Sequence, residues 1–432
     1  MKVNAFARKR WLLVPLGVLL VGALVAAHYG SLTAPARYAD RDFMSLWSGG
    51  RAILEGLDPY DPGVWVPLRS RFGSTWMPDD RAPFPLWTLM LLVPLAILPL
   101  DWAAAAWLVL GELLLGLSVF LLAVQVGGQR LSAAAFAALA LGALVSRGAL
   151  ITLNNGQITF LLLLALTAFL VLSRRRKPFA AGFVLAFVAL KPSPFVLFAP
   201  LIGLWLIARR RWKVVLGSLA GGAVLLAASW LVQPGWLFKW LNVRGKTEAT
   251  FQTPTIWGIA HELSSAWWPL IGMAMAVLLA GGLGWLLLAR QGAGRVATGT
   301  GRMSPAPTGE GEMDEAHAVS LALIGSLLVT PYAWAYEHVL LLIPLLLLFA
   351  RLVVDKLTVR PGPRHLVANM CAWLIWIALV FCLPWLLYWV AVRLDRDTMS
   401  FLVPALVGVA FYVLCVRGAD QWCVHSQAAR SF

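Results

Sequence analysis

Long apolar segments recur along this chain, and they constrain its fold more than any other feature. Several of them reach the roughly 17–25 residues that an α-helix needs to cross a lipid bilayer. Hydrophobic residues make up 60% of the 432 positions and charged residues only 13%, against about 25% charged residues in a typical soluble domain. The 22 tryptophans suit the aromatic belts at the two membrane surfaces. The sequence therefore predicts an all-α, polytopic membrane protein.

We expect about twelve membrane-spanning helices. They lie near residues 11–28, 102–124, 131–151, 157–173, 178–191, 194–208, 213–232, 266–290, 317–331, 336–352, 366–390 and 399–417. The first is interpreted as a retained helix and not a cleaved signal peptide, because it is long for one and further spans follow. Segment 84–100 is also apolar, but its prolines favour a broken, re-entrant or interfacial element over a straight span. Those prolines are Pro83, Pro85, Pro94 and Pro99.

The positive charges of the chain indicate its orientation. The formal net charge is +15, and the cations gather in short clusters between apolar runs. These clusters are Lys2 with Arg8-Lys9-Arg10, Arg174-Arg175-Arg176-Lys177, Arg209-Arg210-Arg211 with Lys213, and Lys356 with Arg360 and Arg364. If segment 84–100 does not cross, all four clusters and both termini lie on the cytoplasmic side, as expected for a protein of the inner (plasma) membrane. This pattern disfavours nucleic acid as a partner.

The chain divides by composition into two membrane modules and a linker. Residues 1–290 form the N-terminal module, which includes a long outer loop at 29–83. Residues 291–316 are rich in Gly, Thr, Pro, Ser and acidic residues, which predicts a disordered cytoplasmic linker. Residues 317–432 form the C-terminal module. No soluble catalytic domain is evident, so any chemistry must take place in the membrane or at its surface.

The outer loop contains a predicted amphipathic helix. Its apolar positions recur at helical spacing, at Phe43, Leu46, Trp47, Gly50, Ile53, Leu54 and Leu57. Asp42 stands at its start, and Gly56 with Pro59-Tyr60-Asp61-Pro62 ends it. We expect this helix to lie on the membrane surface. Asp42 is then either a helix N-cap or a general base held at the bilayer surface.

Three more polar groups are expected on the same outer side. They are Asn154-Asn155-Gly156-Gln157, Lys191-Pro192-Ser193-Pro194, and the segment from Tyr332 through Trp334 to Glu337-His338. Lys191 is either an interfacial anchor or a cation that contacts a lipid phosphate. His338 is either an ordinary interfacial histidine or part of that site, and Asn155 and Gln157 either cap helices or bind a substrate.

Metal and disulfide chemistry have little support in the sequence. The four cysteines, Cys371, Cys382, Cys415 and Cys423, show no CxxC spacing, so we expect from them neither a structural disulfide nor a metal site. Asp79-Asp80 alone is too weak a motif to indicate bound metal.

Several of these motifs together resemble a known family. Asp42-Phe43, Trp47, Gly50-Arg51-Ala52, Gly56 and Asp58-Pro59-Tyr60 resemble the first-loop motif of glycosyltransferase family 87. The similarity continues, in the family's order, through Pro83-Phe84-Pro85-Leu86, Asn155-Gly156-Gln157, Lys191-Pro192-Ser193-Pro194 and Thr330-Pro331-Tyr332-Ala333-Trp334. Two departures stand out, because the family often has a His-His pair where this chain has Glu337-His338, and a serine where it has Thr330.

The resemblance implies a GT-C-like fold and a polyprenyl-phosphate-linked sugar as donor, with mannose as the sugar and a lipid or glycan as the acceptor. The reaction would take place on the periplasmic or extracellular face. No cofactor or metal is implied, because a lipid phosphate leaves without a nucleotide. Asp42 would be the catalytic base. Donor-phosphate binding would fall to Lys191, Arg51 and His338, and substrate binding to Asn155, Gln157, Tyr60 and Trp334.

Two other interpretations stay open at this point. A transporter or flippase for a polyprenyl-linked glycan would also need many spans and buried cations, but not an acidic residue at the head of a surface helix. Inverted repeats would favour it, and none is evident. A structural subunit, or a family member that has lost its activity, is the third interpretation.

Overall fold

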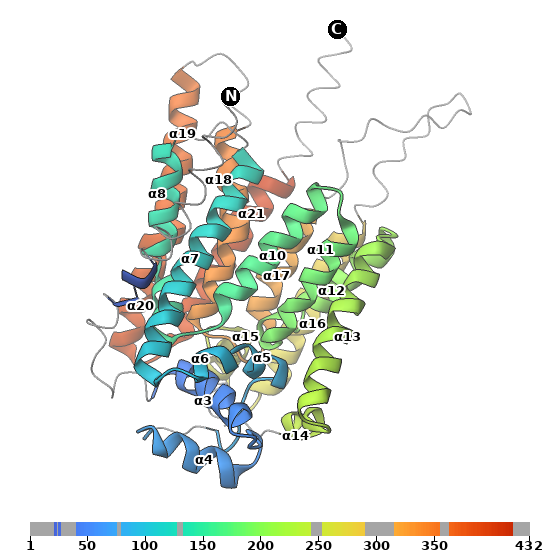
Figure 1. Cartoon of the computed structure of the whole chain (residues 1–432). Helices are drawn as coiled ribbons and strands as arrows, with labels where there is room; N and C mark the ends of the chain where they lie inside the picture. The colour runs from blue at the N-terminus through green and yellow to red at the C-terminus, as the bar shows by residue number, and fades with distance from the viewer. Residues whose placement is uncertain are drawn as a thin grey trace, which may run out of the picture. The chain divides into compact units, whose positions relative to one another are not determined.

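The structure is a computed structural model of the whole chain (Figure 1). It describes residues 21–23, 25–26, 40–75, 79–127, 133–242, 253–289, 315–354 and 363–417. Every regular element in these ranges is a helix. Most of the predicted first span and of the predicted linker lies outside the described residues, as do Lys2, Arg8, Lys9, Arg10, Lys356, Arg360 and Cys423. The predicted division into modules 1–290 and 317–432 therefore stays a prediction.

The chain forms two compact units, each assembled from separate stretches. Unit 1 comprises Met1–Leu114, Leu153–Ile158 and Leu225–Lys246, and unit 2 comprises Leu115–Thr152, Thr159–Val224 and Thr247–Phe432. The described helices of unit 1 include α3 (Asp42–Leu54), α4 (Pro62–Arg71), α5 (Leu86–Leu91), α6 (Val93–Ala96) and α14 (Trp236–Leu241). Helices α7 (Leu100–Gly127), α9 (Arg147–Asn155) and α13 (Trp212–Val232) contribute residues to both units.

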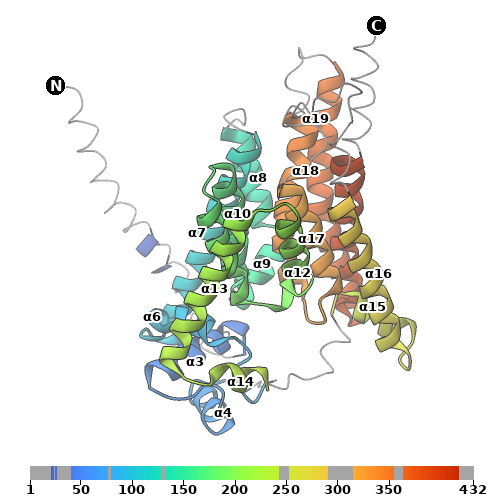
Figure 2. The same cartoon turned by 90° about the vertical axis from the view of Figure 1, so that its right-hand side faces the viewer.

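Unit 2 holds the remaining helices. They are α8 (Ala133–Leu144), α10 (Thr159–Arg174), α11 (Pro178–Leu185), η2 (Ala186–Leu190), η3 (Ser193–Phe195), α12 (Phe198–Ala208), α15 (Ile256–Leu263), α16 (Trp268–Ala289), α17 (Glu315–Val329), η5 (Ala335–Leu341), α18 (Leu342–Val354), α19 (Pro363–Trp376), η6 (Ile377–Cys382), α20 (Leu383–Leu394), η7 (Asp397–Phe401), α21 (Leu402–Phe411) and η8 (Tyr412–Arg417). Helix α17 lies in the core of this unit, since nearly all its side chains are buried. It packs against α12, α16, α18 and α21 (Figure 2).

The described helices make the chain a multi-pass membrane protein. Five of them are long and apolar enough to cross a bilayer: Leu100–Val124, Trp212–Val232, Trp268–Leu288, Met370–Leu394 and Asp397–Val416. The pair Ala135–Leu144 and Arg147–Asn155, bent by 54°, would make a sixth as one broken span. Five further predicted spans form apolar helices of 10–17 residues, which at about 1.5 Å per residue are shorter than the roughly 30 Å hydrocarbon core. The expected number of about twelve spans and the GT-C fold stay predictions.

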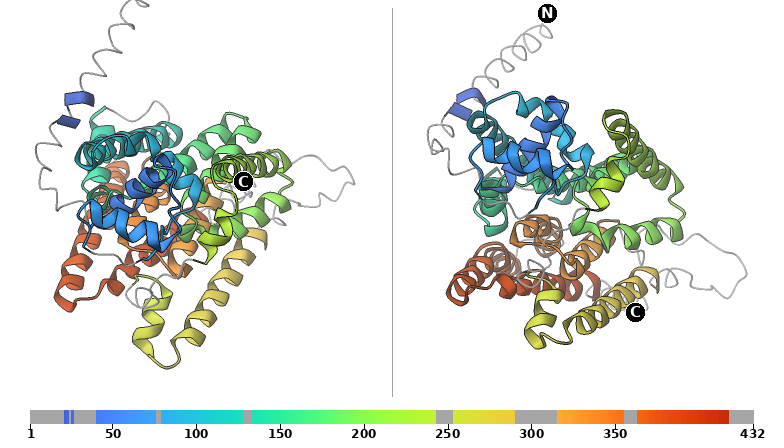
Figure 3. Two further views of the ribbon diagram at one scale, coloured as in Figure 1. Left: turned by 60° about the horizontal axis from the view of Figure 1, so that its bottom comes forward. Right: turned by 90° about the horizontal axis from the view of Figure 1, so that it is seen from below.

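The proline-rich segment 84–100 is broken, as its sequence predicts. It forms the short helices α5 and α6, which are separated at Leu92, before α7 begins at Leu100. Neither short helix could cross a bilayer, because they contain six and four residues. Both pack instead against α3, in the group of blue helices seen from below in the right panel of Figure 3. That the segment is re-entrant or interfacial stays a prediction.

Helix α3 begins and ends where the sequence analysis placed it. Asp42 is its first residue, a favourable position for an acidic side chain near the positive end of the helix dipole. After Glu55 the chain leaves the helix through Gly56, whose φ of +70° suits glycine. The helix differs from a two-faced surface helix in one respect: every residue from Phe43 to Gly50 is buried, because α4, α5 and α6 pack around it.

Candidate active site

The carboxylate of Asp42 is held by a residue that lies far away in the sequence. The side-chain amide of Gln157 donates a hydrogen bond to Asp42 Oδ2, with 2.5 Å between Nε2 and the oxygen. Gln157 is buried, whereas Asp42 is partly exposed. The residue at the N-cap position of α3 is Arg41. Asp42 is thus oriented by a neutral donor, and a carboxylate has further lone pairs with which to accept a proton.

Two hydrogen bonds and a close approach to Phe43 fix the turn that carries Gln157 within unit 1. Arg41 Nη1 donates to Asn155 Oδ1 over 3.1 Å, and Trp107 Nε1 donates to the carbonyl of Gly156 over 2.8 Å. Gly156 has a φ of +65°, and a Cβ added there would lie 2.5 Å from Cβ of Phe43. Only glycine fits this position without strain. The structure therefore brings the Asp42 motif and the Asn155-Gly156-Gln157 motif together, although the sequence separates them.

A second acidic side chain of the loop, Asp40, has a different environment. Its Oδ1 accepts from the backbone N–H of Thr75 at 2.8 Å and from the hydroxyl of Ser74 at 3.2 Å, and its Oδ2 accepts from the hydroxyl of Thr75 at 2.7 Å. Ser74 in turn accepts from Arg69 Nη2 over 3.0 Å. These contacts fasten the chain after α4 to the start of α3, which is a structural task.

Arg69 was missed by the sequence analysis. This arginine of α4 is buried to 1% exposure. Burial lowers its pKa, and the nearby carboxylates of Asp79, Asp40 and Asp42 oppose that effect. Its charge therefore acts on the candidate base as well as on Asp40. The loop sequence gives no local signal for this, because only the fold buries Arg69.

Arg51 and Tyr60 make contacts that hold the loop together. Arg51 Nε lies 2.6 Å from Oε1 of Glu55, and its Nη1 donates to the carbonyl of Ala96 over 3.1 Å. The buried hydroxyl of Tyr60 donates to the carbonyl of Phe84 over 2.8 Å, and burial raises its pKa. Donor binding by Arg51 and substrate binding by Tyr60 stay predictions.

Asp58 anchors the same loop to α14. Its Oδ1 accepts from the backbone N–H of Tyr60 at 2.9 Å, and its Oδ2 lies 2.5 Å from Nζ of Lys239. Burial alone would raise the pKa of Asp58, but hydrogen bonds from Lys239, Gln233 and the Tyr60 backbone outweigh it and lower that pKa. Asp58 is therefore ionised near neutral pH and serves as an anchor of the Asp58-Pro59-Tyr60 motif.

Unit 2 contains the second cluster of predicted site residues, around Lys191. The ammonium of Lys191 lies 2.6 Å from Oε1 of Glu337 and 4.4 Å from the ring centre of Tyr336. The lysine is 6% exposed and the glutamate 1%, so this is a buried ion pair. Glu337 was not assigned a role from the sequence, where only its departure from the family's His-His pair drew attention.

Two more hydrogen bonds join the motifs around this pair. The hydroxyl of Thr330 donates to the carbonyl of Ser193 over 2.6 Å. The backbone N–H of Trp334 donates to Oε2 of Glu337 over 2.9 Å. Glu337 therefore holds Lys191 with one oxygen and the Trp334 backbone with the other. The structure thus brings the Lys191-Pro192-Ser193-Pro194 motif and the segment 330–338 together within unit 2.

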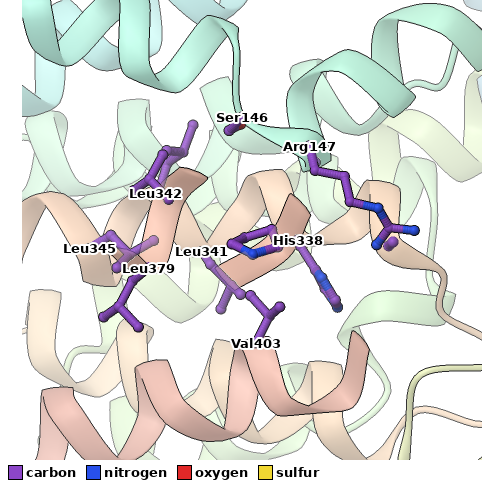
Figure 4. A pocket seen from close by; sticks show the side chains of 12 residues that line it. Ser146, Arg147, His338, Leu341, Leu342, Leu345, Leu379 and Val403 are labelled. Atoms are coloured by element: carbon purple, nitrogen blue, oxygen red, sulfur yellow. The ribbon is translucent and has the colours of Figure 1, made fainter. Parts of the chain in front are cut away.

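His338 faces a different neighbourhood from Glu337. It lines a pocket with Ser146, Arg147, Gly148, Ala335, Leu341, Leu342, Leu345, Leu379, Val380, Pro384 and Val403. Figure 4 shows Arg147 and His338 on one side of this pocket and Leu342, Leu345 and Leu379 on the other. The imidazole of His338 is thus beside a guanidinium, in surroundings that are otherwise mostly apolar.

Arg147 is a buried cation that the sequence analysis overlooked. Its Nη2 lies 3.0 Å from Oδ1 of Asp397, its Nη1 donates to the hydroxyl of Ser400 over 2.9 Å, and its guanidinium lies 4.8 Å from the ring centre of Tyr388. A signal for it was available, because an arginine within a predicted span is a functional candidate by default. Through these contacts, Arg147 connects α9 to α20 and η7.

The predicted site residues therefore fall into two groups. Asp42, Arg51, Tyr60, Asn155 and Gln157 belong to unit 1, and Lys191, Trp334 and His338 belong to unit 2. Of the predicted donor-binding residues, Lys191 and His338 sit in distinct side-chain environments. Their roles in binding stay predictions.

Comparison with known proteins identifies the family. Neither a curated protein nor a solved structure matches this chain. The sequence profile of glycosyltransferase family 87 matches residues 83–303, which is half of the chain and includes Asn155, Gln157 and Lys191. The first-loop motif with Asp42 and the segment 330–338 lie outside the matched range. With its membrane-spanning helices and this match, the chain belongs to glycosyltransferase family 87 and is a membrane glycosyltransferase.

Proposed function

We propose that the enzyme transfers a sugar, mannose or a similar hexose, from a polyprenyl-phosphate donor to a lipid or glycan acceptor. The reaction takes place on the outer face of the inner (plasma) membrane. The observation that carries this proposal is the Asp42–Gln157 pair, a partly exposed carboxylate oriented at the head of a buried helix. Membership of a glycosyltransferase family supports the reaction class.

The chemistry is an in-line displacement at the anomeric carbon of the sugar. The acceptor hydroxyl oxygen forms a bond to that carbon while the bond from the carbon to the phosphate oxygen breaks. The bonding electrons leave with the phosphate, whose charge changes from −1 to −2. The proton of the acceptor hydroxyl passes to the carboxylate of Asp42. The products are the glycosylated acceptor and a free polyprenyl phosphate.

Each predicted site residue has a role in this scheme. Asp42 is the general base, and Gln157 orients it through the hydrogen bond to Oδ2. Lys191, assisted by Arg51 or His338, offsets the charge that develops on the departing phosphate, which is often a large contribution to catalysis. Asn155, Tyr60 and Trp334 complete the binding of substrates.

A transfer assay tests the proposal. The purified protein is incubated with a panel of polyprenyl-phosphate sugars, each labelled in the sugar, together with a membrane lipid extract as the source of acceptors. We expect one donor to yield a labelled glycosidic product that the Asp42→Asn variant forms far more slowly. Movement of the labelled donor across proteoliposome membranes without a new glycosidic bond would support the transporter interpretation instead. If the protein shows neither transfer nor transport, it is an inactive family member.

A further inference from the structure

The ion pair between Lys191 and Glu337 limits what else Lys191 can bind. The two charged groups are 2.6 Å apart, and both side chains are buried. The aromatic face of Tyr336 covers the ammonium at 4.4 Å. A phosphate that approached the same ammonium would meet the Glu337 carboxylate, and like charges in contact repel strongly in a buried site.

The second carboxylate oxygen of Glu337 has a hydrogen-bond partner of its own. Oε2 accepts from the backbone N–H of Trp334 over 2.9 Å, independently of Lys191. If Oε1 turned away from Lys191, the carboxylate would still have a hydrogen bond to the start of η5. The ion pair can therefore open without leaving Glu337 entirely without a partner, which makes an exchange of partners at Lys191 physically reasonable.

We propose that Glu337 competes with the lipid phosphate of the donor for Lys191. Without donor, Glu337 neutralises the ammonium and keeps other anions from it. When the donor binds, its phosphate takes the place of Oε1, and Glu337 keeps its contact with the Trp334 backbone. This inference rests on the proposed function, because it assumes that Lys191 is the contact of the donor phosphate.

Donor affinity in Glu337 variants tests the competition. Glu337→Gln removes the negative charge but leaves a side-chain oxygen that can accept from Trp334. We expect it to bind a polyprenyl-phosphate mannose and the sugar-free polyprenyl phosphate roughly tenfold more tightly than the wild type does, because the competing carboxylate is gone. The variant without ligand should melt at a lower temperature, since Lys191 loses its counter-charge, and each lipid should raise its Tm more than it raises that of the wild type.

A matched control separates competition from general damage. Glu315 in α17 is also a buried glutamate in an ion pair, with its Oε1 2.6 Å from Nη2 of Arg211, although the Arg211 side chain is 51% exposed. Glu315→Gln should lower the melting temperature but leave the affinity for both lipids unchanged. If Glu315→Gln tightened binding as much as Glu337→Gln, the effect would be one of loosened packing and the competition would be refuted.

The failure of this inference can be told apart from the failure of the proposed donor site. If Lys191→Ala binds both lipids as the wild type does, Lys191 is not the phosphate contact and both proposals lose that site. If Lys191→Ala weakens binding but Glu337→Gln fails to tighten it, the donor site stands and the competition is wrong. The double variant Lys191→Ala/Glu337→Gln should show no tightening over Lys191→Ala.

A second variant keeps the test decisive if Glu337→Gln does not fold. Glu337→Asp retains the charge but draws the carboxylate back by one methylene, which weakens its hold on Lys191. Competition predicts a tightening of about two- to fivefold for both lipids, smaller than that of the charge-neutral variant. Unchanged or weaker binding in a folded Glu337→Asp protein would overturn the inference.

Discussion

The substitution Asp42→Asn separates the chemical role of Asp42 from its structural one. Asparagine has nearly the same shape, and its side-chain oxygen can still accept from Nε2 of Gln157, so the contact of 2.5 Å is kept in neutral form. The loss of stability should be at most about 1 kcal/mol, because a hydrogen bond to a charged acceptor becomes one between neutral groups. Asparagine cannot take up the proton of the substrate hydroxyl at neutral pH. Turnover should therefore fall by a factor of roughly 10²–10⁴, the usual contribution of a general base.

Initial rates at varied donor concentration measure this effect. We expect kcat to fall while the affinity for the donor and the melting temperature stay close to those of the wild type. Asp40→Asn is the internal control, because Asp40 accepts from Ser74 and from both donors of Thr75. It should lose about 1–3 kcal/mol of stability and keep its turnover. Wild-type turnover in Asp42→Asn would refute the assignment of the base, and loss of turnover at Asp40 instead would move the base by two residues.

Three further predictions concern the second cluster, the turn at Gly156 and the topology. Lys191→Ala should weaken donor binding while Lys191→Arg retains part of it, as measured by donor KM, because a phosphate contact depends mainly on positive charge. Equal KM values would leave Lys191 only as the ion-pair partner of Glu337. Gly156→Ala should lower stability by about 2–4 kcal/mol, because it combines a left-handed backbone with a Cβ that meets Phe43. The control in a thermal melt is Gly222→Ala, whose Cβ would meet nothing within 4 Å. Equal stability of the two variants would contradict the account. Cysteines introduced near residues 75 and 245 should react with a membrane-impermeant reagent outside intact cells, whereas one near 305 should not; labelling at 305 would overturn the topology.

Local structure followed from the sequence where a few neighbouring residues decide it. Asp42 and Gly56 bound helix α3 because an acidic first turn and a glycine with positive φ are local requirements. The prolines of segment 84–100 break it into α5 and α6 for a similar reason. Such features leave a readable pattern in a short stretch of sequence.

The pairing of charges could not be predicted in the same way. Lys191 meets Glu337, and Arg147 meets Asp397 across 250 positions of sequence, so neither pair leaves a local trace. The environment of α3 was misjudged for a related reason, since α4, α5 and α6 cover what would otherwise be its polar face. Apolar composition predicted the helices correctly. It did not predict their lengths, because these depend on breaks such as the 54° bend between Leu144 and Arg147. Helix length in turn decides whether a segment can span a bilayer alone.

The stoichiometry of a single turnover tests the central claim most directly. The purified enzyme, in excess, is mixed with a polyprenyl-phosphate sugar that carries one label in the sugar and another in the lipid, together with an acceptor that the panel assay has identified. We predict that each labelled sugar found in a glycosidic product is matched by one free polyprenyl phosphate, and that Asp42→Asn forms both products more slowly by the same factor. Sugar transfer without release of polyprenyl phosphate, or release that Asp42→Asn does not slow, would contradict the account.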